Sequence, residues 1–327
     1  MLPDADDLPE LLLDLAVPHE DINQVVALRK TVTADPGVQR LLAECADEVT
    51  GATATKAGAG DPSGLGELAA TAPAALDGYF LVYVFLAAVP HARAYHHARG
   101  VPADVSRRTL ADLGRGMTLH RRRYGRGGLA PLQASWLTRH FRGELYQLGR
   151  LQYERARLGE HTARAITATD TDTGTGTNTD TGTDTGTGHA VSVAPGQPCL
   201  NLHIPDYCGP LTPTACDRSL ALAREFFPQH FPEEQYPVAT CHSWLLDPQL
   251  RRYLPADSNI VRFQDRFRPG YVDPEPADTT AVRFVFGAPD LPVRDLPRRT
   301  SVERAVGDHL RAGGHWYLGH GWIPWER

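Results

Sequence analysis

Two histidines lie on segments whose pattern predicts β-strands, His203 in CLNLHI and His242 in VATCHSWLL. A histidine side chain has an unperturbed pKa of about 6.5, so it can accept or release a proton near neutral pH. Alternation along a strand places His203 on the face of Asn201, opposite Leu202, and His242 on the face of Thr240. Each histidine can also be an ordinary hydrogen-bonded structural residue. We expect His203 to be the first candidate for a general base and His242 the second.

The sequence neighbours of His242 suggest two other kinds of chemistry. Cys241 and Ser243 are potential nucleophiles, but adjacent strand residues point to opposite faces, so His242 is badly placed to activate either one. We therefore do not expect covalent catalysis. Further histidines on a helical segment lack an acid or cysteine at ligand spacing: His91, His96 and His97. His315 and His320 are compatible with packing on a sheet, and we expect no metal site.

A helix start near Thr212 has the features of an anion-binding site. Thr212 can cap the helix, Pro213 suits its first position, and the backbone N–H groups that follow can bind a phosphate. An ordinarily capped helix after a turn explains the same residues. The candidate ligand-binding residues are Gly209, Leu211, Thr212, Thr214 and Ala215.

The elements that must position these residues fall into two parts. Residues 1 to about 130 read as all-helical, with a helix opened by Asp35-Pro36 and a long apolar helix from near Pro73 to Arg99 that Pro90 should bend or break. Beyond about residue 135, short apolar segments separated by turns predict strands at 146–157, 199–204, 238–246, 260–267, 281–286 and 315–318. Helices are expected between some of them, at 212–227, 247–253 and 301–311. This order predicts a mixed α/β domain.

A run of Thr, Asp and Gly, Thr167 to Gly188, lies between the first two predicted strands. Such a composition cannot bury enough apolar surface to fold, so we expect a disordered insertion. A calcium-binding repeat is the alternative, although the glycine-rich nonapeptide pattern is missing.

Arginine-rich segments leave a similar choice open. The arginine-rich segment at residues 115–126 overlaps HRRRYGRGG (His120 to Gly128). It either binds phosphate, forms a solvated helix end, or bridges to the acidic helices before residue 50. Arg298-Arg299 precedes another predicted helix start, and the same alternatives apply to these two arginines. No nucleic-acid-binding module surrounds these arginines and the chain has a formal net charge of −6, so we expect no nucleic-acid partner.

The overall composition excludes several classes of protein. With 327 residues, 42% of them hydrophobic and 22% charged, the chain is neither disordered, collagen-like nor coiled-coil. Its longest apolar run, Tyr79 to Pro90, is shorter than the roughly 18 residues that cross a bilayer, and the acidic N-terminus does not resemble a secretion signal. We expect a cytoplasmic protein without a membrane partner, with its five cysteines as free thiols.

Five blocks together resemble a known family: LPELLLDLAVPHEDI, LTRHFRGELYQLGRLQYE, LHIPDYCGPLTPTACDRSL, CHSWLLDPQLRRYLPADSNIVRFQDRF and LPRRTSVERAVGDHLRAGGHW. They are similar to acyltransferase proteins that join a helical N-terminal domain to a GNAT-like C-terminal domain. The resemblance implies an α+β fold, with helical residues 1–130 packed on a mixed α/β domain of residues 131–327 whose central sheet is mostly antiparallel.

The resemblance also implies a chemistry. In GNAT enzymes an acyl-CoA thioester lies between two diverging strands, its pyrophosphate sits on a helix N-terminus, and an amine attacks the thioester directly. The implied co-substrate is acyl-CoA, expected to be acetyl-CoA, and the acceptor an amine on a small molecule or peptide. Tyr253 then corresponds to a tyrosine that often protonates the leaving thiolate. Of the usual pyrophosphate loop only Gly209 is present.

Two functions from different classes remain open. One is a CoA-dependent N-acyltransferase. The other is a GNAT-like ligand-binding or scaffold protein without catalysis, because fold alone does not determine function. They differ in whether CoA binds and turns over. The sequence does not indicate the oligomeric state.

Overall fold

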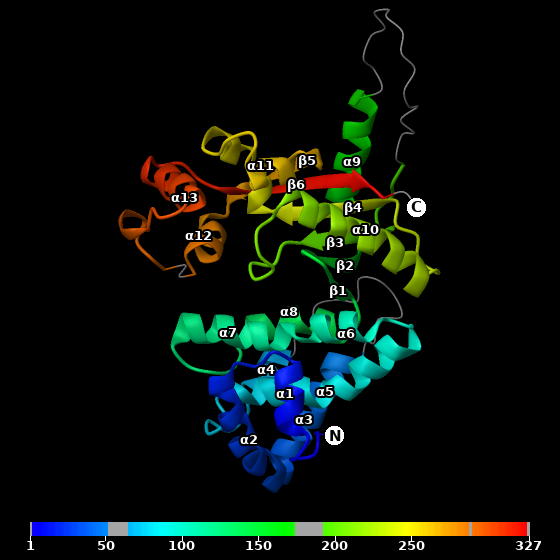
Figure 1. Cartoon of the computed structure of the whole chain (residues 1–327), viewed down its shortest axis with the longest axis vertical. Helices are drawn as coiled ribbons and strands as arrows, with labels where there is room; N and C mark the ends of the chain where they lie inside the picture. Colours follow the sequence, from blue (N-terminus) through cyan, green and yellow to red (C-terminus); the bar gives the residue numbers. More distant parts are fainter. Residues whose placement is uncertain (1, 52–64, 174–191, 288–289, 326–327) are drawn as a thin grey trace, which may run out of the picture. The chain divides into compact units, whose positions relative to one another are not determined.

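A computed structural model describes residues 2–51, 65–173, 192–287 and 290–325 (Figure 1). The chain divides into two compact units, Met1–Gln147 and Leu148–Arg327. In the described residues, no helix has both the length and the apolar character that a membrane span requires.

The described residues up to 130 form helices, as predicted, whereas the first unit extends further, to Gln147. Its helices are α1 (Leu8–Asp14), α2 (His19–Ala34), α3 (Pro36–Thr50), α4 (Leu65–Ala69), α5 (Tyr79–Ala98), α6 (Ala103–Leu110), α7 (Asp112–Tyr124) and α8 (Pro131–Phe141). The predicted start at Asp35-Pro36 is confirmed, because the Asp35 side chain accepts hydrogen bonds from the Gly37 and Val38 N–H groups at 2.7 and 3.3 Å.

The long apolar helix differs from the prediction at two points. It begins at Tyr79 rather than near Pro73, and Pro90 lies inside α5 without ending it. Residues on nearly all sides of α5, such as Phe80, Phe85 and Val89, are buried in the core of this unit. Because tertiary packing provides most of the stability of such a helix, it tolerates the one hydrogen bond that a proline removes.

The arginine-rich segment bridges to acidic residues of the same unit. Arg121 of α7 forms an ion pair with Asp21 of α2, whose carboxylate is fully buried and also accepts a 2.5 Å hydrogen bond from the Tyr79 hydroxyl. Arg126 pairs with Asp77 at 2.6 Å. The structure therefore shows the expected bridge to the acidic N-terminal helices at Arg121, whereas the partner of Arg126 lies outside those helices.

The chain contains a six-stranded sheet in the order β1-β2-β3-β4-β6-β5, of which β2 to β6 lie in the second unit. Strands β3 and β4 run parallel, whereas β2–β3, β4–β6 and β5–β6 are antiparallel, so the mixed, mostly antiparallel sheet is confirmed. The strands are β1 (Leu145–Leu148), β2 (Leu151–Arg157), β3 (Pro198–His203), β4 (Val238–Ser243), β5 (Arg268–Pro276) and β6 (Tyr317–Pro324).

Two predicted strands are helices. Residues 260–267 form most of α11 (Asn259–Gln264), whose start is capped by Ser258 Oγ, and residues 281–286 belong to α12 (Asp278–Phe286). Short apolar runs of this length fit either structure. Ser258 caps the start of α11, whereas α12 has no side-chain cap at its start and ends at Gly287, which has a left-handed φ of +73°. The predicted helix at 247–253 is a 3₁₀ turn, Pro248–Arg252. The predicted strand at 238–246 ends at Ser243, and its last three residues form another 3₁₀ turn, Trp244–Leu246.

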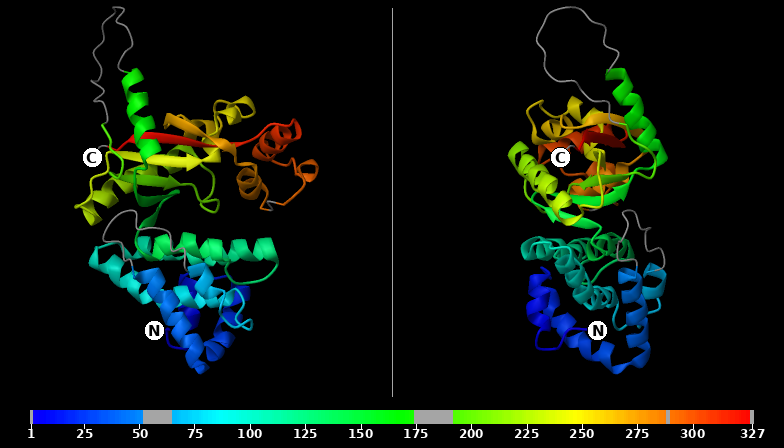
Figure 2. Two further views of the ribbon diagram at one scale, coloured as in Figure 1. Left: turned by 180° about the vertical axis from the view of Figure 1, so that it is seen from behind. Right: turned by 90° about the vertical axis from the view of Figure 1, so that its right-hand side faces the viewer.

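Helices cover both faces of the sheet. Figure 2 shows α9 (Glu160–Thr173) and α10 (Pro213–His230) on opposite sides. On the α10 side, Tyr153 of β2 contacts Ser219 and Phe227. On the α9 side, Ile166 lies in a buried cluster with Trp322 of β6. The Thr/Asp/Gly run predicted to be disordered begins inside α9, and its part from 174 onward lies outside the described residues.

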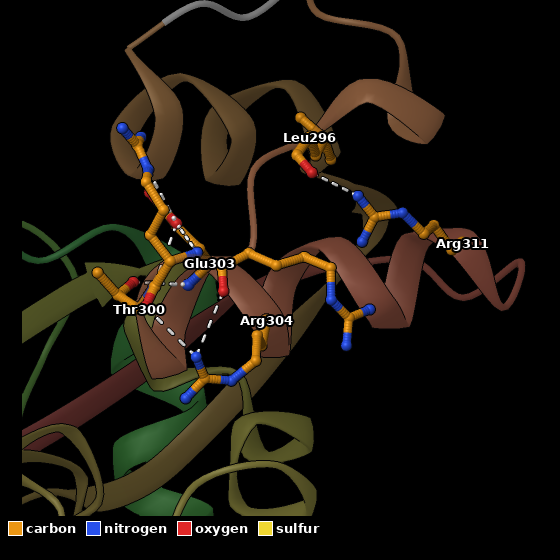
Figure 3. A network of polar contacts seen from close by, with 7 residues as sticks. Leu296, Thr300, Glu303, Arg304 and Arg311 are labelled. Carbon is orange, nitrogen blue, oxygen red and sulfur yellow. Dashed lines mark hydrogen bonds and ion pairs between the residues drawn. The ribbon is translucent and has the colours of Figure 1, made fainter.

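The second helix start with arginines is a structural cap. At the beginning of α13 (Ser301–Arg311), Glu303 N–H donates to Thr300 Oγ1 and Thr300 N–H donates to Glu303 Oε2, both at 3.1 Å (Figure 3). Arg299 pairs with Glu303 at 2.9 Å, and Arg298 pairs with Asp308. Both arginines therefore pair with acidic residues of α13 itself.

Candidate active site

The candidate histidines lie where the two parallel strands stop pairing. The hydrogen-bonded register of β3 and β4 runs from Leu200–Ala239 to Leu202–Cys241. His203 and His242 each follow one residue after the last pair, at the same end of neighbouring strands. The end of pairing at this point is what two diverging strands require.

The predicted face of His203 is confirmed by its contacts. His203 Nε2 lies 2.7 Å from Glu154 Oε2 of β2, and Asn201 Nδ2 donates to the same carboxylate oxygen at 3.4 Å. His203 and Glu154 retain 22% and 16% side-chain exposure, so the pair is shielded but reachable by a ligand. An imidazole held by a carboxylate in this way is oriented, and any positive charge it gains is stabilised.

His242 lies in a second cluster on the same face. Its ring stacks on that of His320 of β6 with centroids 3.5 Å apart, and its Nε2 lies 3.0 Å from Asp273 Oδ2 of β5. His320 in turn stacks on Tyr271, with centroids at 3.8 Å. Burial and the neighbouring His242 lower the pKa of His320 to about 4. His242 is thus one of two imidazoles directed at a single carboxylate.

Cys241 is poorly suited to be a nucleophile, as the strand alternation predicted. Its side chain is 1% exposed, and burial raises the pKa of its thiol to about 12. Reactive cysteines need a thiolate near neutral pH, so this thiol is inert in the folded protein. None of the five cysteines forms a disulfide, in agreement with the expected thiols.

The predicted cap of α10 is also present. Thr212 Oγ1 accepts a hydrogen bond from Ala215 N–H at 3.3 Å, and Pro213 occupies the first turn. Cys216 N–H donates to the Thr212 carbonyl. Most of the N–H groups expected to bind an anion are therefore used within the cap, and Thr214 N–H is the one that the described contacts leave for a ligand. Before the helix, Gly209 adopts a left-handed φ of +75°.

Two arginines supply positive charge beside this helix start. Arg150, only 8% exposed, donates through one Nη to the Pro205 carbonyl at 2.9 Å. Arg266 donates to the Pro213 carbonyl at 3.1 Å and pairs with Asp217 at 2.5 Å. Within the described residues, the Nε of each arginine is buried without a hydrogen-bond partner. Two orphaned guanidinium donors at a helix N-terminus match what a pyrophosphate needs.

Tyr253 belongs to a separate group of side chains. Its hydroxyl lies 2.9 Å from His309 Nδ1, and its ring packs on those of His309 and Trp316. The tyrosine is 41% exposed. None of its described ring or hydrogen-bond contacts is with His203 or His242.

Sequence reasoning missed several of these residues. The missed residues are Arg150, Glu154, Arg266, Asp273 and His320 as functional groups. Gln152 and Glu154 alternate along β2 with the apolar Leu151 and Tyr153, which is the signal that they share one face of the sheet. The residue that faces His203 is determined by how β2 and β3 align, and this alignment cannot be read from a single sequence.

Comparisons with known families match nearly the whole chain. Residues 6–143 match an N-acyltransferase N-terminal domain, and residues 145–323 match a GNAT-like C-terminal domain. The chain belongs to this N-acyltransferase family. Curated proteins yield no match to it.

Solved structures of acyltransferases resemble this family member over its full length. One is an acyltransferase in complex with decanoyl-CoA and teicoplanin, 36% identical, with a TM-score of 0.79, covering 100% of this chain and 90% of that one. A mutant acyltransferase in complex with octanoyl-CoA is 36% identical, with a TM-score of 0.78, 99% of this chain and 89% of the other being covered. A third, in complex with CoA and 10C-teicoplanin, is 36% identical with a TM-score of 0.79, at 100% and 90% coverage. The protein is thus an acyltransferase related to enzymes that bind acyl-CoA.

Proposed function

We propose that this acyltransferase moves an acyl group from acyl-CoA to an amine, with His203 as the general base. The observation that carries the proposal is the His203–Glu154 pair, 2.7 Å apart, at the point where β3 and β4 cease to pair. The orphaned donors of Arg150 and Arg266 near the start of α10 fit the pyrophosphate of CoA.

The proposed reaction is a direct aminolysis. The amine nitrogen attacks the thioester carbonyl carbon, the carbon–sulfur bond breaks, and an amide and the CoA thiolate form. His203 accepts the proton from the attacking nitrogen, and the Glu154 carboxylate stabilises the resulting imidazolium. The thiolate takes up a proton, for which Tyr253 is the donor that the family resemblance implies. Its hydrogen bond to His309 provides a route for replacing that proton.

The comparisons change the proposed length of the acyl chain. The sequence led us to expect acetyl-CoA, whereas the related structures hold decanoyl-CoA and octanoyl-CoA. At 36% identity over the full chain, a medium-chain donor is the better proposal. For the acceptor we propose an amine on a small molecule or peptide, and teicoplanin is the first probe because a relative was crystallised with it.

The experiment compares acyl-CoAs of two to twelve carbons in one assay of CoA release, with teicoplanin and with simple amines as acceptors. Melting temperatures are measured in parallel, since a ligand at about 100 times its Kd adds about 2.7 kcal/mol of stability. We expect stabilisation by CoA and turnover with eight- or ten-carbon donors. Stabilisation without turnover for every acceptor would favour the non-catalytic binding protein, and the absence of both would refute acyl-CoA binding.

A further inference from the structure

A group of three side chains on three adjacent strands has the donor set of a metal site. His242 of β4 and His320 of β6 are paired in register, and Asp273 of β5 faces both rings. Their donor atoms all lie within 4.8 Å of one another. We propose that His242, Asp273 and His320 bind a divalent transition-metal ion, with zinc as the reference ion.

The distances between the donors fit a metal ion. Zinc binds imidazole nitrogen at 2.0–2.1 Å and carboxylate oxygen at 2.0–2.2 Å, so donors at tetrahedral angles are about 3.3 Å apart. His242 Nε2 lies 3.0 Å from Asp273 Oδ2, and His320 Nε2 lies 3.2 Å from Asp273 Oδ1. The rings of His242 and His320 are stacked with centroids 3.5 Å apart, so one of them must rotate before both nitrogens point at the same ion.

The state of His320 is an independent observation in favour of a ligand. Its Nε2 is buried and, within the described residues, makes no hydrogen bond of acceptable geometry, despite its short distance to Asp273. This buried nitrogen thus faces a carboxylate oxygen at 3.2 Å without an aligned hydrogen bond, and an ion between the two groups accounts for that. A metal ion bound by both His320 Nε2 and the Asp273 carboxylate gives the nitrogen a partner, and it does not require the nitrogen to be aligned with the oxygen.

The surroundings hold the site in place and leave it accessible. Tyr271 stacks on His320, and its hydroxyl lies 3.3 Å from Thr162 Oγ1 of α9. A register irregularity in β5 falls between Pro269 and Tyr271. Such bulges re-aim side chains beside functional sites. His242 is 39% exposed, which leaves the ion a path from solvent and room for a water ligand.

Other histidine–carboxylate pairs in the described chain lack this composition. His315 lies 2.7 Å from Asp278, and His203 lies 2.7 Å from Glu154, each with one imidazole on one carboxylate. Two imidazoles and a carboxylate suit zinc, cobalt, nickel and copper rather than magnesium or calcium. The His315–Asp278 pair is therefore the matched control.

The test uses the full chain, freed of any affinity tag and of metal by chelation, and titrated with ZnCl₂ by calorimetry and with CoCl₂ by visible absorption. We expect one ion per chain, and a loss of affinity of about 100-fold or more in His320→Ala and Asp273→Asn, since even outer-sphere changes cost 10- to 100-fold. His315→Ala should bind as the wild type does. Folding of each variant is verified without metal by its melting temperature.

Two results would overturn the proposal. One is the absence of stoichiometric binding at micromolar to submillimolar metal. The other is binding that His320→Ala and Asp273→Asn leave unchanged, which would place the ion elsewhere, for instance on the partly exposed Cys208. Sulfur ligation of cobalt gives a charge-transfer band in the near ultraviolet, and the proposed site predicts that this band is missing.

Discussion

Replacing Arg150 by methionine tests how the protein recognises the pyrophosphate of CoA. Methionine preserves much of the side-chain volume and removes the charge and the buried Nε donor. Arg150 is only 8% exposed, and its Nε has no hydrogen-bond partner within the described residues. If the donor binds phosphate, the substitution should weaken CoA binding far more than it weakens the fold.

The size of the effect follows from the burial of the arginine. A hydrogen bond to a charged group contributes about 1.5–3 kcal/mol, which corresponds to a change in Kd of about 10- to 150-fold. We expect the upper half of this range for Arg150 because, among the described residues, it forms no ion pair that competes with the phosphate. Arg266→Met should fall in the lower half, since Arg266 is 20% exposed and already pairs with Asp217.

The assay is calorimetric titration with CoA and, separately, with pantetheine, which lacks the pyrophosphate. Arg157→Met is a matched control, because Arg157 also donates to a backbone carbonyl, that of Gly196 at 2.7 Å, but lies exposed at the end of β2. The loss should appear for CoA alone. Equal binding of CoA by Arg150→Met and wild type, or an equal loss for pantetheine, would refute the pyrophosphate assignment.

Three other predictions concern stability and thiol reactivity. Arg155→Met should destabilise the protein by about 3–5 kcal/mol in urea unfolding, because it leaves the Glu234 carboxylate, whose side chain is 9% exposed, without its bidentate partner. The double variant Arg155→Met with Glu234→Gln should recover part of that loss. Cys208 should react first with a thiol reagent at pH 8, since it is the least buried cysteine and burial raises the pKa of Cys241 to about 12; an unchanged fast phase in Cys208→Ser would contradict this. Burial, with His140 nearby, lowers the pKa of His96 to about 4, so between pH 6.5 and 4 the unfolded chain binds more protons than the folded one. The free energy of unfolding should therefore decrease as the pH is lowered from 6.5 to 4, and it should decrease less in His96→Gln than in wild type.

The sequence contains enough to predict the strands that bear the histidines. Alternation placed His203 with Asn201, and both contact Glu154 in the structure. Cap chemistry placed the start of α10 at Thr212. These features depend on residues close together in the chain, and local patterns determine them.

Partners from distant strands could not be predicted in the same way. Glu154 meets His203 through the register of β2 and β3, which are separated by α9 and the Thr/Asp/Gly run. Asp273 lies on β5, whose sequence RPGYVDPEP has too much proline and glycine to read as a strand. It pairs with β6 as an edge strand, where missing donors are tolerated. The cluster of His242, Asp273 and His320 could therefore not be predicted from the sequence.

The most direct measurement of the central claim is the turnover number of His203→Ala, with octanoyl-CoA or decanoyl-CoA as donor and teicoplanin as acceptor. His242→Ala and His315→Ala are measured beside it, and the melting temperature of each variant shows whether it is folded. Loss of a general base reduces the rate by about 10²- to 10⁴-fold. We expect that loss for His203→Ala at a wild-type melting temperature, and near wild-type turnover for His315→Ala. A folded His203→Ala enzyme that turns over within about threefold of the wild type would contradict the assignment of His203 as the base.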